Sequence, residues 1–277
     1  MTQKLAKYSN LTQRIIAAII GATIIISGMM FSPLTYWLVF LLLSVMTQAE
    51  FYRLVGLNGN IPLTIYGTLC GVILNILTYF IESEVWPFKF YYAVIPLLAI
   101  TFFIKLYKHS DKRPFENLGY TFLGIIYVAV PFSLVIEIGI EPETYRPLLM
   151  LGIMLVLWVN DTGAYFAGTL MGKRKLFERI SPKKTWEGFF GGAISSLLVA
   201  FVFSRFYPDL VIWKWLVIAL IISITGTLGD LVESLFKRSL QVKDSGSLIP
   251  GHGGFLDRFD GLLLSIPFIL TFLKIFS

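Results

Sequence analysis

The feature that most constrains this chain is a series of apolar segments, each about 17 to 25 residues long, separated by short polar breaks. A helix of that length crosses the hydrocarbon core of a bilayer, whereas a soluble core uses segments with one buried and one wetted face. Only 14% of the 277 residues are charged, against about 25% in a soluble domain. The sequence therefore predicts a protein that is embedded almost entirely in a membrane.

The apolar segments predict an all-α fold, because they are too long and too uniformly apolar for the strands of a membrane barrel. We expect about nine transmembrane helices, at residues 15–30, 32–48, 62–81, 90–106, 118–138, 147–169, 188–206, 211–230 and 259–276. The first segment lacks a small-residue cleavage site and leads straight into the next, so we expect a span there and not a secretory signal. The single cysteine, Cys70, excludes an internal disulfide.

The positions of Lys and Arg predict the orientation. With the N-terminus inside, most of the 23 Lys and Arg residues fall in cytoplasmic segments, as membrane proteins prefer. The two longest polar loops, 170–187 and 231–258, then lie on the cytoplasmic side. The net charge of +6 is explained by this orientation and not by nucleic-acid binding, because the basic residues sit in short loops.

Polar residues inside the predicted spans are few up to about residue 145 and more frequent after it. We therefore divide the chain into N-terminal transmembrane helices, 1–145, and a C-terminal catalytic region, 146–277, which contains both long loops. On this division the chemistry is expected after Met150.

Four aspartates are the candidate metal ligands. An acidic side chain in a membrane helix costs about 2.5 to 3.5 kcal/mol on insertion scales, so it needs a partner or a function. Asp161 lies within the sixth predicted span and Asp230 ends the eighth, while Asp257 and Asp260 are three residues apart and share one face of the last helix. Carboxylate oxygens suit Mg²⁺. Two alternatives stay open: Asp161 as a polar link between helices, and Asp260 as a favourable charge at a helix N-terminus.

Residues 229–238 have helical spacing, with apolar residues on one face and charged ones on the other. The polar face is formed by Asp230, Glu233, Ser234, Lys237 and Arg238. An ordinary solvated face with a Glu233–Lys237 ion pair is the alternative to a site here.

Glycines surround His252 at positions 251, 253 and 254, in a pattern that favours a turn around a phosphate. His252 itself is open to three interpretations: a general base, a hydrogen-bond donor to a phosphate, or a structural link. The loop 170–187 mixes six basic residues with Phe177, Ile180 and Trp186, which is typical of a segment at the lipid headgroups. A topology signal without a ligand is the alternative.

Residues 234–260 resemble the signature of the phosphatidate cytidylyltransferases, also called CDP-diacylglycerol synthases, at every defined position and spacing. The signature covers Ser234-Leu235-Phe236-Lys237-Arg238, Lys243-Asp244, Gly246, Ile249-Pro250, His252-Gly253-Gly254-Phe255 and Asp257-Arg258-Phe259-Asp260. Residues 160–165 and 181–188 are also similar to the family. The resemblance implies CTP and phosphatidic acid as substrates, Mg²⁺ dependence, a location in the cytoplasmic (inner) membrane, and a homodimer.

The expected reaction is transfer of a cytidylyl group from CTP to phosphatidic acid, giving CDP-diacylglycerol and pyrophosphate, at a site that faces the cytoplasm. We expect one or two Mg²⁺ ions on Asp161, Asp230, Asp257 and Asp260. Catalytic roles are expected for Asp230, Lys237, Arg238, Lys243, His252, Asp257 and Arg258. Substrate contacts are expected from Lys173, Ser181, Lys183, Lys184, Ser234, Asp244, Gly253 and Gly254.

Two other classes of protein compete with this interpretation. A secondary transporter also carries acids in membrane helices, although it has little use for a long glycine-histidine loop in the cytoplasm. A lipid kinase or another CTP-dependent lipid enzyme would share the basic loops, and labelled CTP separates these from cytidylyl transfer.

Overall fold

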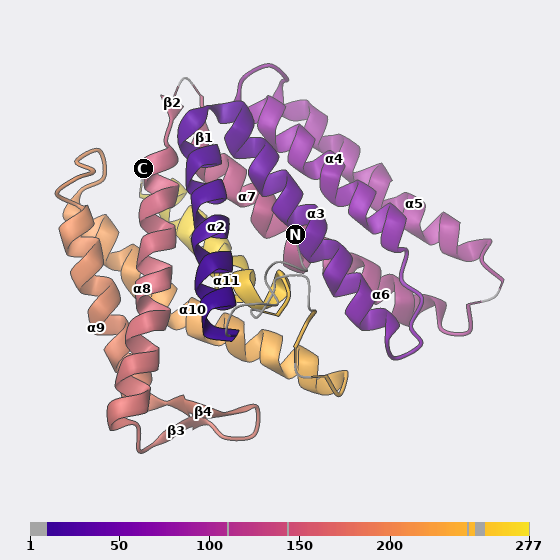
Figure 1. Ribbon diagram of the computed structural model, residues 1–277. Helices are drawn as coiled ribbons and strands as arrows, with labels where there is room; N and C mark the ends of the chain where they lie inside the picture. The colour runs from indigo at the N-terminus through magenta and orange to yellow at the C-terminus, as the bar shows by residue number, and fades with distance from the viewer. Residues whose placement is uncertain (1–9, 110, 143, 243, 247–252, 277) are drawn as a thin grey trace. The chain divides into compact units, whose positions relative to one another are not determined.

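The computed structural model describes residues 10–109, 111–142, 144–242, 244–246 and 253–276, and these are almost all helical (Figure 1). The helices are α2 (Asn10–Phe31), α3 (Pro33–Gly56), α4 (Thr64–Glu82), α5 (Val94–Leu106), α6 (Pro114–Gly124), α7 (Val130–Gly139), α8 (Pro147–Met171), α9 (Trp186–Phe203), α10 (Ile212–Ser239) and α11 (Leu256–Ile275). A 3₁₀ turn, Phe88–Ala93, precedes α5, and a π-helical turn, Ile125–Ala129, joins α6 to α7. The predicted all-α fold is confirmed.

Two short antiparallel hairpins interrupt the helices. The first pairs β1 (Ile140–Glu141) with β2 (Thr144–Tyr145), and the second pairs β3 (Lys175–Phe177) with β4 (Ser181–Thr185). The predicted loop at 170–187 therefore contains a β-hairpin, which the sequence pattern did not indicate.

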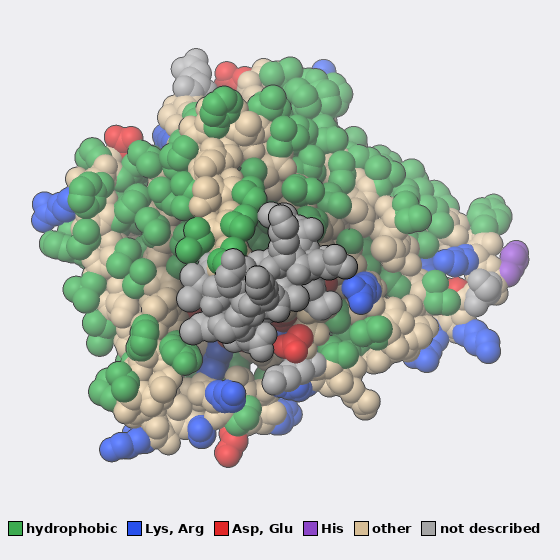
Figure 2. Space-filling view, in the orientation of Figure 1, with side chains coloured by type: hydrophobic (Ala, Val, Ile, Leu, Met, Phe, Trp, Pro, Cys, Tyr) green, Lys and Arg blue, Asp and Glu red, His purple; other side chains and the backbone are tan. Residues whose placement is uncertain are grey.

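Seven helical segments among the described residues are long and apolar enough to cross a membrane: Pro33–Gly56, Thr64–Glu82, Phe88–Leu106, Pro114–Gly139, Pro147–Met171, Trp186–Phe203 and Ile212–Ser239. Hydrophobic side chains are plentiful on the surface, as Figure 2 shows, and Ile65 is 88% exposed. A surface of this kind is suited to lipid, which confirms a polytopic membrane protein. The remaining two expected spans match α2, with its apolar part at Ile16–Phe31, and α11, and the count of nine stays a prediction.

The chain forms two compact units. The first contains Met1–Tyr145 together with Val242–Arg258, and the second contains Arg146–Gln241 together with Phe259–Ser277. The described part of this segment, residues 242, 244–246 and 253–258, thus belongs with the N-terminal helices, although the sequence pattern placed it in the C-terminal region. Helix α10 also continues to Ser239, past its predicted end at residue 230, because residues 231–239 keep their helical spacing.

Helix α3 is central to the first unit. Its rings Tyr36, Phe40, Phe51 and Tyr52 are at most 1% exposed, and the Tyr36 hydroxyl donates to the Val135 carbonyl of α7 over 2.6 Å. The Tyr52 hydroxyl donates over 2.8 Å to the carbonyl of Thr121 in α6. Buried tyrosines of this kind combine apolar packing with a satisfied hydroxyl, so they fix both the distance and the register between helices.

A buried ion pair joins the end of α5 to the start of α6 in the same unit. The Lys105 ammonium contacts the Asp111 carboxylate and donates to the Ile61 carbonyl over 2.6 Å, and both charged side chains are 1% exposed. Asn117 donates to Asp111 over 2.7 Å. Burial raises the pKa of the Asp111 carboxyl, but the hydrogen bonds that it accepts outweigh burial and hold that pKa below its usual value.

We expect Asp111→Asn to lower the free energy of unfolding by about 3 kcal/mol, because Lys105 is left buried without its counter-charge. Since the folded-state pKa is lowered, this stabilisation is present above the ordinary pKa of about 3.9 and is lost as the pH falls through the folded value. Thermal unfolding in detergent at about pH 6 and below pH 4 measures this loss. Glu116→Gln, which breaks the exposed Arg113–Glu116 pair, is the control and should cost less than about 1 kcal/mol. Equal shifts for the two variants would contradict this account.

Candidate active site

Helices α10 and α11 approach closely in the second unit because small residues lie where they cross. A Cβ added to Gly229 would lie 2.6 Å from the carbonyl oxygen of Asp260, and a Cβ added to Gly261 would lie 3.5 Å from the Gly226 Cα. The Thr225 hydroxyl donates to Ser265 over 2.9 Å across the same crossing. Small residues with an interhelical hydrogen bond are the usual means of close packing in membranes.

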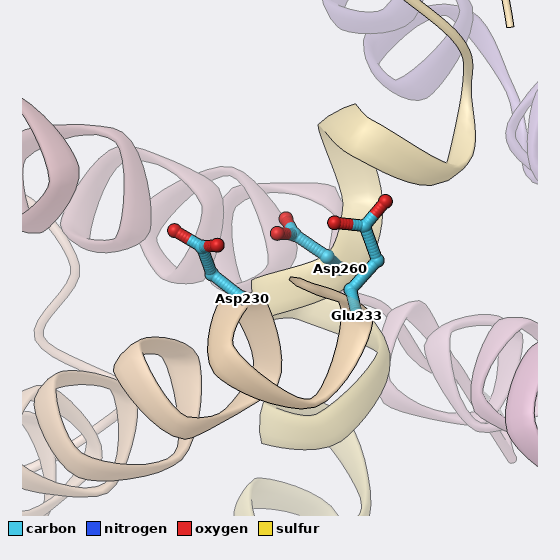
Figure 3. Close-up of side chains that lie close together, drawn as sticks. All are labelled: Asp230, Glu233 and Asp260. Atoms are coloured by element: carbon cyan, nitrogen blue, oxygen red, sulfur yellow. The ribbon is translucent and has the colours of Figure 1, made fainter. Parts of the chain in front are cut away.

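This crossing brings three carboxylates together. Asp230 and Glu233 extend from α10 and Asp260 extends from the start of α11, and each offers an oxygen within 4.8 Å of the others (Figure 3). Glu233 is buried, and Asp230 and Asp260 are half-buried. Asp161 of α8 is exposed and is not one of these three, although it is near enough to act electrostatically on the Asp260 carboxylate. We call Asp230, Glu233 and Asp260 the carboxylate cluster.

Cationic side chains border the carboxylate cluster. The Lys184 ammonium of β4 lies 2.7 Å from Asp230 and also donates to the Thr227 carbonyl over 3.2 Å. Lys237 lies 2.5 Å from Glu233, one turn along α10. Ser234 donates to Asp230 over 3.2 Å. The Glu233–Lys237 pair that the sequence offered as an alternative is therefore present, and it is also part of the cluster.

The hairpin that carries Lys184 is anchored at both ends. Glu187 accepts hydrogen bonds from the backbone N–H groups of Lys173 and Arg174 at 3.0 and 3.2 Å, and Thr185 caps α9 by accepting from the Gly188 N–H over 3.1 Å. Basic side chains lie along the lower edge of Figure 2, over β3 and β4. The hairpin thus places Lys184 in an ordered position next to α10.

The chemistry of the carboxylate cluster fits a divalent cation. Its donors are hard oxygens from two helices, which Mg²⁺ and Mn²⁺ prefer, and the two lysines beside it pair with only two of its three carboxylates in the ion pairs described. Asp230, Asp260 and Glu233 are therefore the residues of this unit that would hold the metal. Glu233 was not among the predicted ligands, because its helical spacing to Lys237 explained it equally well.

In the first unit, the described residues 244–246 and 253–258, which we call the signature segment, are arranged around Asp257. Its carboxylate accepts hydrogen bonds from the N–H groups of Gly254, at 2.9 Å, and Ser245, at 3.1 Å. Gly253 has a φ of +83°, which favours glycine. Asp244 and Arg258 are exposed. Two predicted site residues, Lys243 and His252, lie outside the described residues.

Glu50, which contacts this segment, was not among the residues predicted from the sequence. Glu50 of α3 is 3% exposed and contacts Ser245, Phe255 and Leu256. The expectation that chemistry-bearing residues begin after Met150 stays a prediction, but a residue before Met150 contacts the signature segment. An isolated acid at the end of an apolar run was the available signal, but the predicted span 32–48 stopped before it.

The remaining predicted residues divide between the units. Asp161, Lys173, Ser181, Lys183, Lys184, Asp230, Ser234, Lys237, Arg238 and Asp260 belong to the second unit, and Asp244, Gly253, Gly254, Asp257 and Arg258 belong to the first. Lys173 and Lys183 are exposed, and Ser181 is half-buried in β4 opposite Phe177.

Comparison with known families identifies the chain. The model of the cytidylyltransferase family matches residues 12–276, which is nearly the whole chain. This chain belongs to the cytidylyltransferase family.

Individual relatives agree with this assignment. The chain is 44% identical over 176 residues to a phosphatidate cytidylyltransferase of Staphylococcus saprophyticus, a match that spans 62% of this chain and 66% of the relative. It is 41% identical over 187 residues to the phosphatidate cytidylyltransferase of Bacillus subtilis, spanning 67% of each. The chain thus matches just under two thirds of the length of the staphylococcal relatives.

For a cytidylyltransferase with this arrangement, we expect the α10–α11 crossing to be essential for binding cations. Gly229→Ala would push a methyl group against the backbone of Asp260 and separate the carboxylates, so the affinity for Mn²⁺ should fall about 10- to 100-fold. Electron paramagnetic resonance of free and bound Mn²⁺ in the purified protein measures this.

The matched control is Gly226→Ala, three residues earlier on α10. Its methyl group would meet only the ends of side chains, Leu157 Cδ1 at 3.1 Å and Ser265 Oγ at 3.6 Å, which can shift. If both variants bind Mn²⁺ like the wild type, the crossing does not position the carboxylates.

Proposed function

We propose that this chain transfers the cytidylyl group of CTP to the phosphate of phosphatidic acid, forming CDP-diacylglycerol and pyrophosphate. The observation that carries the proposal is the meeting of the carboxylate cluster with Lys184 and Lys237, in a chain that belongs to the cytidylyltransferase family. The staphylococcal and Bacillus relatives bear the name of this activity.

The reaction itself needs little acid-base chemistry. An oxygen of the phosphatidate phosphate attacks the α-phosphorus of CTP, a new P–O bond forms, and the bond to the β-phosphate breaks with its electrons leaving on pyrophosphate. A phosphate monoester has a second pKa of about 6, so the nucleophile is largely ionised at neutral pH. The main obstacle is the repulsion between two polyanions, which positive charge and in-line positioning overcome.

The basic side chains are proposed to meet the two substrates. Lys237, Arg238, Lys243 and Arg258 would neutralise the triphosphate, and Lys173, Lys183 and Lys184 would receive the lipid phosphate. Lys184 pairs with Asp230, so its ammonium is held beside the carboxylate cluster, where a phosphate oxygen of the lipid could approach it. The acyl chains of the lipid stay in the bilayer during the reaction.

Mg²⁺ is the proposed cofactor, as one ion or two. When bound by Asp230, Glu233 and Asp260, with Asp161 and Asp257 as further proposed ligands, it would supply positive charge to the phosphates of CTP. We also propose that the site faces the cytoplasm, which the distribution of Lys and Arg supports, and that the protein lies in the inner membrane. The proposed homodimer follows from the family resemblance.

The activity is tested with purified protein, phosphatidic acid, Mg²⁺ and CTP labelled either on the cytosine or on the γ-phosphate. We expect the cytosine label to appear in the lipid and the γ-phosphate label in pyrophosphate. Label from the γ-phosphate in the lipid would instead indicate a kinase, and no transfer of either label would contradict the proposal.

In the same assay, Asp230→Asn and Asp260→Asn should each lower kcat/KM by about 100-fold or more, because the developing negative charge loses its counter-ion. Asp209→Asn changes an exposed acid in the turn between α9 and α10 and serves as the control, with activity expected within about twofold of wild type. Near-normal turnover by both cluster variants would remove the carboxylate cluster from the mechanism.

A further inference from the structure

Glu50 is a buried acid whose partners, among the described residues, come from the signature segment. Its Oε2 accepts a hydrogen bond from the Phe255 N–H over 2.9 Å, and its Oε1 accepts from the Leu256 N–H over 3.2 Å and from the Ser245 hydroxyl. A buried carboxylate is tolerated only when its oxygens are hydrogen-bonded, and here three donors satisfy it. The position of Glu50 in α3 is thereby linked to residues about 200 positions later in the sequence.

Two of these donors belong to the start of α11, which begins at Leu256. The first N–H groups of a helix have no partner within the helix and carry partial positive charge. The carboxylate of Glu50 therefore caps α11 from a different helix. This contact fixes the first turn of α11, which carries Asp257 and Arg258.

Ser245, the third donor, fixes the N-terminal part of the signature segment. Ser245 gives its hydroxyl to Glu50 and its N–H to Asp257, while the Gly254 N–H also goes to Asp257. Asp257 thus links residue 245 to residue 254, and Glu50 links residue 245 to the start of α11.

The glycines of the segment fit this interpretation. A Cβ added to Gly254 would overlap Glu50 Oε1, and one added to Gly246 would lie 3.1 Å from the same carboxylate. At position 254 a side chain would occupy the space of the Glu50 carboxylate, and at position 246 it would press against that carboxylate. Gly254 is therefore required by Glu50, which is a different reason from the phosphate turn predicted around His252.

We propose that Glu50 is a positioning residue for the signature segment: by anchoring Ser245, Phe255 and Leu256, it orients the part of the enzyme that receives the triphosphate. The inference rests on the proposed function and deepens it. Glu50 acts through Asp257 and Arg258 and has no contact with the reacting atoms in this proposal. A residue that only stabilises the fold would change the active fraction of the protein but not the KM for one substrate.

The test variant is Glu50→Gln. A carboxamide keeps the shape but has a single acceptor oxygen, so at least one of the three donors loses its partner. We expect kcat/KM for CTP to fall about 10- to 100-fold, mainly through a higher KM for CTP, with the KM for phosphatidic acid within about twofold of wild type. Amide hydrogen exchange at Phe255 and Leu256 should also accelerate, whereas Glu50→Asp, which keeps the charge, should have a smaller effect on both.

The control is Gln48→Met in the same helix. Gln48 is fully buried and donates to Tyr52 and to the Gly67 carbonyl, so its loss destabilises the unit without touching the signature segment. We expect this variant to lose thermal stability and active fraction while keeping the KM for CTP. If Glu50→Gln shows this same pattern, or leaves exchange at Phe255 and Leu256 unchanged, the inference is wrong.

Ser245→Ala keeps the proposal testable even if Glu50→Gln does not fold. This substitution removes one of the three donors to Glu50, so we expect a KM for CTP about three- to tenfold higher. An unchanged KM would count against the proposed role of Glu50. When both substitutions are combined in a variant that folds, Ser245→Ala should raise the KM for CTP little beyond the effect of Glu50→Gln. Fully additive effects on this KM would mean that the two residues act separately. Hydrogen exchange can be measured without enzyme activity. An inactive wild type would therefore refute the proposed function, while exchange at Phe255 and Leu256 would still test the contact with Glu50.

Discussion

The structure of the second unit depends on how closely α10 approaches α11. Carboxylates repel one another and prefer water, so bringing three of them within 4.8 Å in a largely apolar protein requires a rigid support. Gly229 and Gly261 provide it, since their missing side chains let the two backbones touch. The electrostatic cost of the cluster is offset by Lys184 and Lys237, and in the proposed enzyme by Mg²⁺ as well.

In the first unit two acids are stabilised mainly by backbone donors and not by lysines. Glu50 and Asp257 are satisfied largely by N–H groups of the signature segment, in addition to the Ser245 hydroxyl. A motif that looks from its sequence like a self-contained phosphate loop is thus held from outside by a helix of the N-terminal half. The conformation of that motif depends on packing as much as on its own glycines.

Much of this organisation was accessible from the sequence. The length and apolarity of the segments predicted the helices, because the membrane leaves few other solutions for the backbone. Asp230 and Asp260 were expected to be close, since both sit at the polar ends of apolar helices. The β3–β4 hairpin was not predicted, because its short strands have no clear alternation, and neither was Glu50, whose partners are distant in the sequence and become apparent only in the folded unit. The pairing of Lys184 with Asp230 likewise depends on tertiary structure.

In the proposed enzyme the carboxylate cluster holds the divalent cation of cytidylyl transfer. Anomalous diffraction at the manganese edge, from crystals grown with Mn²⁺ and CTP, would locate this cation. We expect a manganese peak within coordination distance, about 2.0 to 2.3 Å, of oxygens of both Asp230 and Asp260. A fully occupied manganese site that contacts neither carboxylate would contradict this proposal.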